Sequence, residues 1–153
     1  MGYNPRVQIS ISGRRAWRAS AALVWAGAYV VRLAAQQPPD TAALKASAGV
    51  YTDAQAARGR ETFGNNCLGC HNVGSQSGDA FIKRWKGATL AEMFRLLTDQ
   101  MPKDTPGSLS VQERADVMAY LLKLNDYAAA TAELPPDLEQ LKKIVIDIGG
   151  AHP

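Results

Sequence analysis

The chain has 153 residues, of which 46% are hydrophobic and 20% are charged. This length suits one modest domain with additional segments, and the composition excludes a disordered or collagen-like chain. The 17 basic residues exceed the 14 acidic residues by three, an excess that taken alone favours a nucleic-acid or anionic-membrane partner. Only two cysteines and two histidines occur, which excludes a dense disulfide framework and leaves a zinc finger only if all four converge.

The basic excess is concentrated at the N-terminus. Residues 1–35 contain five arginines and no acidic residue, so the rest of the chain carries a net charge of −2. We therefore do not expect a nucleic-acid partner. An uncharged run of small and apolar residues covers residues 19–31, and it is shorter than the roughly 20 residues that span a bilayer. We interpret residues 1–35 as a signal peptide, with an uncleaved membrane anchor as the alternative, and expect export to the bacterial periplasm.

Residues 36–51 contain two adjacent prolines and no amphipathic repetition, and we interpret them as a linker. Beyond them, a Thr or Ser is three times followed three positions later by Gln or Glu, the pattern of a capping box at a helix start. The three pairs are Thr52/Gln55, Thr89/Glu92 and Ser110/Glu113.

Each pair is followed by apolar or small residues at helical spacing. These residues are Ala56, Gly59 and Phe63, then Leu90, Met93, Phe94 and Leu97, and then Val117, Tyr120, Leu121 and Leu124. The sequence predicts an all-α domain over residues 52–127 with three main helices and short loops. We expect residues 128–153 to form a C-terminal extension in which Asp137 and Gln140 begin a short helix and three apolar residues pack back, namely Leu138, Leu141 and Ile144.

The run Cys67-Leu68-Gly69-Cys70-His71 lies between the first two predicted helices. C-x-x-C-H is the attachment signature of c-type haem, in which two thiols add to the porphyrin vinyl groups and the imidazole reaches the iron. A thioredoxin-like dithiol would follow a strand in a βαβ unit, which this sequence lacks. A zinc site would need two further ligands, and only His152 remains. The run therefore predicts one haem c bound covalently through Cys67 and Cys70, with His71 on the iron.

The other face of the iron needs a ligand from elsewhere in the chain. Met93 and Met118 lie within helical patterns, where methionine usually fills the core. His152 is the penultimate residue of a tail that we expect to fray. Met101 instead lies at the end of a helix, and Pro102 restricts the backbone beside it. We predict Met101 as the sixth ligand.

With these residues in place, the chain resembles the class I, single-haem cytochromes c. Gly59 and Phe63 precede Cys67 by eight and four residues, as in the family's N-terminal helix, whose glycine lets the C-terminal helix cross closely. The resemblance implies that Tyr120 and Leu121 supply this crossing. It covers roughly residues 52–146.

From Phe81 to Leu134 the chain is more closely similar to small cytochrome c proteins and domains that accompany quinoprotein dehydrogenases. The residues that carry this second likeness are Phe81, Trp85, Thr89, Leu90, Met101, Pro102, Pro106-Gly107-Ser108-Leu109-Ser110, Ala119-Tyr120-Leu121-Leu122 and Glu133-Leu134-Pro135. Such domains are reused with many partners, so this association is less specific than the haem signature.

One departure from the family concerns the residues after the haem histidine. Family members usually carry a proline there, whose carbonyl region accepts the imidazole Nδ1–H, yet residues 72–81 contain none. Some acceptor is still expected, because that bond fixes the tautomer, and its identity stays open. Trp85 resembles the tryptophan that bonds a haem propionate, with packing on the macrocycle edge as the alternative. Its basic neighbours either form a solvated face or hold propionates; they are Lys83, Arg84 and Lys86.

Ligation by His71 and Met101 implies a one-electron carrier and not an enzyme, because the iron then has no vacant site. We expect electrons to pass from a periplasmic dehydrogenase, such as a quinoprotein dehydrogenase, or from a quinol-oxidising complex to a terminal oxidase or another acceptor. The protein is then either a shuttle or the cytochrome subunit of a dehydrogenase complex. We expect neither a nucleic-acid partner nor a small-molecule substrate. We expect contact with a membrane only if residues 1–35 remain attached to the chain. The alternatives are a haem enzyme such as a peroxidase, which usually needs a second haem signature, and a gas sensor with a detachable Met101.

Overall fold

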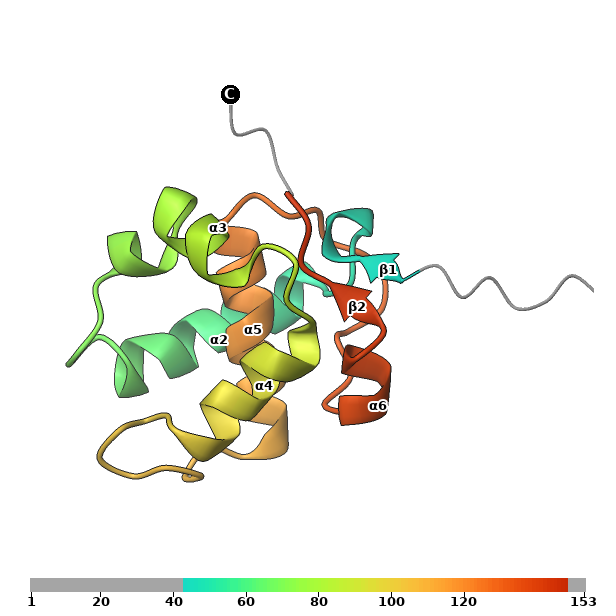
Figure 1. The fold of residues 1–153 in the computed structure, drawn as a ribbon. Helices are drawn as coiled ribbons and strands as arrows, with labels where there is room; N and C mark the ends of the chain where they lie inside the picture. Colours follow the sequence, from blue (N-terminus) through green and yellow to red (C-terminus); the bar gives the residue numbers. More distant parts are fainter. Residues whose placement is uncertain (1–42, 149–153) are drawn as a thin grey trace, which may run out of the picture. The chain divides into compact units, whose positions relative to one another are not determined.

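The computed structural model describes residues 43–148. The predicted signal peptide, the first part of the predicted linker and His152 lie outside them. The described residues form a helical domain with a small parallel sheet (Figure 1). Its elements are, in chain order, β1 (Leu44–Lys45), the 3-10 helix η2 (Ala46–Ala48), α2 (Asp53–Asn66), the 3-10 helix η3 (Val73–Gln76), α3 (Gly78–Trp85), α4 (Leu90–Asp99), α5 (Val111–Leu124), α6 (Leu138–Leu141) and β2 (Ile144–Val145).

The predicted helix starts are present at all three positions. Thr89 and Ser110 form complete capping boxes at α4 and α5. At α4, hydrogen bonds from the Thr89 amide and hydroxyl lower the pKa of the Glu92 carboxyl, so this residue stays ionised beside the helix N-terminus, where negative charge is favourable.

The start of α2 differs from the prediction. Thr52 accepts from the Gln55 amide at 3.1 Å, but the Gln55 side chain does not reach back to it. That side chain is fully buried; its Nε2 donates to the Leu134 carbonyl at 2.9 Å and its Oε1 accepts from the Leu134 amide at 2.7 Å. The prediction of a full capping box was wrong here, because Gln55 instead ties α2 to the C-terminal segment.

Helices α2 and α5 cross at Gly59 (Figure 1). A Cβ on Gly59 would lie 1.8 Å from the carbonyl oxygen of Asp116 in α5. The closest approach is thus made by the α5 backbone one turn before Tyr120, and Tyr120 contributes to the contact between the helices by packing its ring 5.4 Å from that of Phe63. At the same crossing, Arg58 bonds both carboxylate oxygens of Asp116, at 2.9 and 3.0 Å.

The segments on both sides of the predicted 52–127 domain belong to the same core. Ala46 and Tyr51 are buried, although they fall in the range predicted as a linker, and β1 pairs in parallel with β2. Leu134 and Ile146 are fully buried as well.

The predicted C-terminal helix is confirmed as α6. Asp137 caps it by accepting from the Gln140 amide at 2.8 Å, and three apolar side chains of this region pack against the core, namely Leu138, Leu141 and Ile144.

The three-helix prediction missed α3. This helix has only eight residues, and its N-cap, Ser77, makes no side-chain capping bond. Its first amide, that of Gly78, donates instead to the Asn125 side chain at the end of α5, at 2.8 Å. Phe81 and Trp85 lie one turn apart on its buried face. A helix whose start depends on a residue 47 positions away leaves no local capping signal.

The close crossing at Gly59 predicts that alanine lowers the stability of the domain at this position but not elsewhere in α2. Gly59→Ala forces α2 and α5 apart, and overpacking of this kind costs about 3 kcal/mol. Gly64→Ala, in the same helix with nothing within 4 Å of its Cβ, should be neutral or stabilising by about 0.5–1 kcal/mol. Thermal unfolding followed by circular dichroism compares the two variants. Equal melting temperatures would show that the crossing is not as close as described.

Candidate haem-binding site

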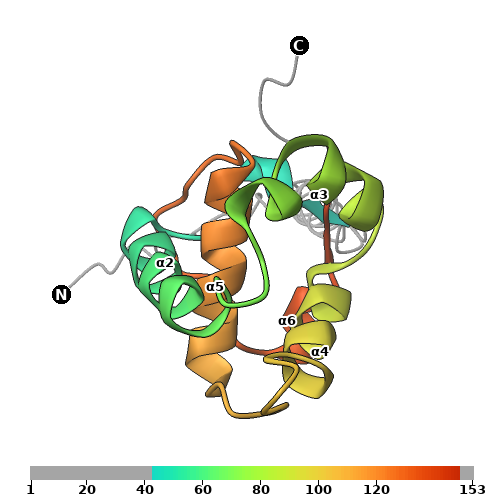
Figure 2. The ribbon, with the colours of Figure 1, turned by 90° about the vertical axis from the view of Figure 1, so that its left-hand side faces the viewer.

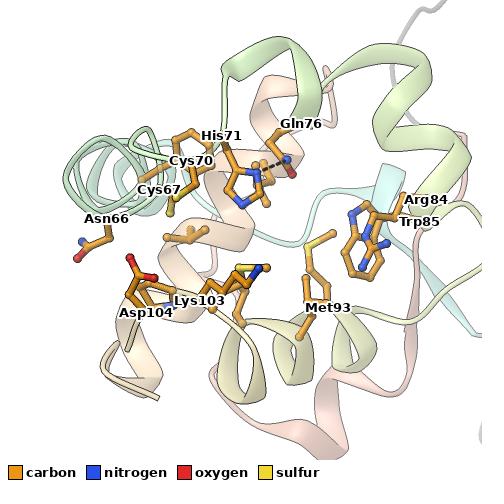
Figure 3. Close-up of a pocket in the computed structure, with 17 residues that line it drawn as sticks. Asn66, Cys67, Cys70, His71, Gln76, Arg84, Trp85, Met93, Lys103 and Asp104 are labelled. Atoms are coloured by element: carbon orange, nitrogen blue, oxygen red, sulfur yellow. Dashed lines mark hydrogen bonds between the residues drawn. The ribbon is translucent and has the colours of Figure 1, made fainter. Parts of the chain in front are cut away.

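A cavity of about 470 Å³ lies among α2, α3, α4, α5 and the loop that follows α4 (Figure 3). In Figure 2 the chain that follows α2 and contains Cys67, Cys70 and His71 passes in front of α5 on its way to α3. The residues that line the cavity are Phe63, Asn66, Cys67, Cys70, His71, Gln76, Arg84, Trp85, Met93, Leu96, Leu97, Met101, Pro102, Lys103, Asp104, Val117 and Leu121. The C-x-x-C-H residues and Met101 thus meet at one site.

The two cysteines and His71 are held by a turn at the end of α2. The Cys67 amide donates to the Phe63 carbonyl at 2.9 Å, so Cys67 continues directly from the helix. The amides of Cys70 and His71 both donate to the Cys67 carbonyl, at 3.1 and 2.8 Å. This turn places two thiols and an imidazole on the same cavity, and the thiols are not joined in a disulfide.

Burial raises the pKa of the Cys67 thiol. A redox-active dithiol typically has a lowered pKa in an electropositive setting and follows a strand. Here the thiol is partly buried at the end of a helix. The site therefore does not resemble a thioredoxin-like centre.

The imidazole of His71 lies between the cavity and the side chain of Gln76 (Figure 3). Its Nδ1 lies 3.4 Å from the Gln76 side-chain amide. Sequence reasoning expected an acceptor for Nδ1–H without identifying one. Gln76 follows His71 by five residues, so the sequence does contain a polar side chain that could be this partner. Only the structure shows that the 3-10 helix η3 brings its side chain back to the imidazole.

Of the three candidates for the sixth ligand among residues 43–148, two reach the cavity. Met101 lines it from the loop after α4, and Met93 lines it from within α4 (Figure 3). Met118 is fully buried in α5 and does not line it, as expected of a core methionine, and His152 lies outside the described residues. The interpretation of Met93 as a core filler is incomplete, because its side chain is buried but also faces the cavity.

The basic residues of α3 divide into two groups. Arg84 lines the cavity together with Trp85, and its guanidinium lies 5.0 Å from the indole ring centroid. All three basic side chains are exposed, but Lys83 and Lys86 do not line the cavity. Within residues 43–148, Arg84 makes no ion pair. Arg84 therefore places a positive charge beside the cavity, which suits a haem carboxylate.

These features fit a covalently held haem. The cavity volume lies within the roughly 300–1,000 Å³ typical of cofactor sites, and its lining is largely apolar, with a few polar groups at its edge. Within the described part of the chain, no three His, Cys, Asp or Glu residues are grouped so that they could hold a metal ion.

Among residues 43–148, no helix combines the length and apolar character needed to cross a membrane.

Comparison with known protein families agrees with this site. Residues 54–121 match the family described as cytochrome C oxidase, cbb3-type, subunit III. Comparisons with curated proteins and with solved structures find no significant match. Residues 54–121 are thus a cytochrome c domain, and the chain binds haem c covalently through Cys67 and Cys70. The all-α cytochrome c fold predicted from the sequence is confirmed.

The cavity predicts that folding depends on haem attachment. The double variant Cys67→Ala with Cys70→Ala should fail to accumulate as folded protein, because an empty cavity at the centre of a small domain leaves its walls without packing partners. Leu68→Ala, at an exposed position between the cysteines, is the matched control and should give normal holoprotein. Yield and pyridine haemochrome absorbance measure both. A stable, helical, haem-free double variant would refute this dependence.

Proposed function

We propose that this c-type cytochrome is an exported one-electron carrier whose haem iron is bound by His71 and Met101. The observation that carries the proposal is that both side chains line the cavity that also receives the two attachment thiols. Haem attachment outside the cytoplasm agrees with the export signal expected in residues 1–35, so we propose a periplasmic location.

When bound, the haem supplies an iron that changes by one electron. The residues of the chain determine what else that iron does. His71 and Met101 would hold the iron, and with both bound it would have no coordination site open to oxygen or peroxide. A neutral thioether ligand and a largely apolar lining favour the less charged ferrous state. Both effects place the reduction potential toward the higher end of the range for haem proteins.

The loop that bears Met101 is anchored to the rest of the domain. The Thr105 amide donates to the Pro102 carbonyl at 3.0 Å, which closes a turn directly after the ligand. Further along, the largely buried Arg114 of α5 donates from Nη2 to the Gly107 carbonyl at 3.3 Å. Its guanidinium also lies 5.8 Å from the ring centroid of Phe94. An anchored loop favours a permanently bound Met101, and hence a carrier over a gas sensor.

Electron exchange needs a surface where the haem edge approaches solvent. Cys70 is exposed, and two apolar side chains beside it are also exposed, Leu68 at 49% and Val73 at 40%. A small apolar surface of this kind suits brief contacts with redox partners. We propose a dehydrogenase, such as a quinoprotein dehydrogenase, or a quinol-oxidising complex as the donor. The match to a family described as an oxidase subunit supports an oxidase as the acceptor.

Carbon monoxide tests the ligand set. The ferrous protein should not bind CO rapidly at neutral pH, because the iron has no vacant site. Met101→Ala should bind CO rapidly and show a lower reduction potential, since the soft axial thioether is lost. Met93→Leu, which alters the other cavity methionine, is the matched control and should behave as the unmodified protein does.

Two outcomes would overturn this proposal. Rapid CO binding by the unmodified protein would favour a sensor or an enzyme. CO binding that is gained in Met93→Leu and not in Met101→Ala would assign the ligand to α4.

A further inference from the structure

We infer that the side-chain oxygen of Gln76 accepts the Nδ1–H of His71, so that Gln76 is the positioning residue that orients the haem histidine and tunes its potential. This inference rests on the proposed role of His71 as an iron ligand. It supplies the acceptor that the missing proline after the haem histidine leaves unassigned.

The geometry brings the two side chains together. The Gln76 amide lies 3.4 Å from His71 Nδ1, and the imidazole lies between that amide and the cavity (Figure 3). A histidine that binds iron through Nε2 carries its proton on Nδ1, which is then a donor. The oxygen and nitrogen of a glutamine amide exchange places by a half-turn of the terminal bond. The carboxamide oxygen of Gln76 can therefore face Nδ1–H from the same position.

The remaining surroundings of His71 offer no competing acceptor. Within residues 43–148, Gln76 is the only hydrogen-bond partner of the imidazole ring. Residues 72–81 contain no proline, and the backbone there is used otherwise: the Asn72 carbonyl accepts from Ser75, and the Gln76 carbonyl accepts from Asn125.

Gln76 is held in place by a buried residue of α5. Asn125, fully buried at the C-cap of α5, donates from Nδ2 to the Gln76 carbonyl at 3.0 Å and to the Leu121 carbonyl at 2.7 Å. Its Oδ1 accepts from the Gly78 amide at 2.8 Å. The Asn125 side chain thus fixes the backbone at Gln76 and just after it, so the glutamine is pre-positioned.

The turn before Gln76 is fixed separately. Asn72 Oδ1 accepts from the Ser75 amide at 2.8 Å, which closes η3. Gln76 Nε2 also donates to Ser75 Oγ at 3.3 Å. A hydroxyl can accept or donate, so Ser75 holds the Gln76 amide in either orientation.

The proposed bond has a definite electronic effect. An acceptor on Nδ1–H increases the basicity of the imidazole, and a more basic ligand stabilises ferric iron more than ferrous iron. Removing the acceptor should therefore raise the reduction potential, and a stronger, anionic acceptor should lower it. A purely structural role for Gln76 would not produce shifts of opposite sign.

The test compares three variants of the holoprotein by redox titration at neutral pH. Gln76→Leu removes the acceptor and should shift the ferric–ferrous equilibrium about tenfold toward ferrous iron, which is about 59 mV for one electron. Gln76→Glu should shift it in the opposite direction. Gln140→Leu makes the same change at an exposed position of α6 that does not line the cavity, and it should leave the potential unchanged. In proton NMR of the ferrous holoprotein, the His71 Nδ1–H signal should exchange faster with solvent in Gln76→Leu than in Gln76→Glu.

Unchanged potentials in both Gln76 variants, or shifts of the same sign, would overturn the inference. So would an Nδ1–H signal that is indifferent to all three substitutions. Neither result affects the carrier proposal. That proposal is tested by CO binding, which depends on the sixth ligand, Met101, and not on Gln76.

Discussion

The crossing of α2 and α5 at Gly59 is the constraint on which the site depends. From this crossing, the C-terminal end of α2 carries the two cysteines and His71 to the cavity. Helix α5 reaches the supports of both predicted iron ligands: Arg114, in its first half, bonds the loop that bears Met101, and Asn125, at its C-terminal end, bonds Gln76 beside His71. A shift of α5 against α2 would therefore displace both faces of the haem site together.

The segments outside the helix crossing supply packing that a domain of fewer than about 80 residues usually lacks. Gln55 ties α2 to Leu134 by two buried bonds, and the Tyr51 hydroxyl donates to the Tyr127 carbonyl at 2.5 Å. The backbone of Ile146 bonds both Gly87 and Ala88 ahead of α4. Residues 43–51 and 128–148 thus complete the core on the side away from the C-terminal end of α2 (Figure 1), and the haem is not the only element that holds the domain together.

Much of this arrangement was predictable because its signals are local. The capping boxes at Thr89 and Ser110 and the C-x-x-C-H run depend on residues within four positions of each other, so their chemistry is visible without the fold. Helix α3 was missed because its first amide is satisfied by Asn125, far along the chain. Gln55 was misread for the same reason, since its partner is Leu134.

The features of the cavity that the sequence did not reveal also depend on distant contacts. Met93 belongs to the apolar stripe of α4, which from the sequence alone indicates a core position. Only the packing of α4 shows that its side chain faces the cavity. Gln76 becomes the neighbour of His71 through the turn η3 and its anchor on α5. Arg84 is distinguished from Lys83 and Lys86 only by the orientation of α3. In each case, the residue type fits the chemistry, but the tertiary structure decides which of several similar residues reaches the site.

The most direct measurement of the central claim is an experimental structure of the oxidised holoprotein. It should show one haem attached to Cys67 and Cys70, with His71 Nε2 and Met101 Sδ on opposite faces of the iron. An iron bound by Met93, or by water with Met101 turned away, would contradict the account of a closed electron-transfer site.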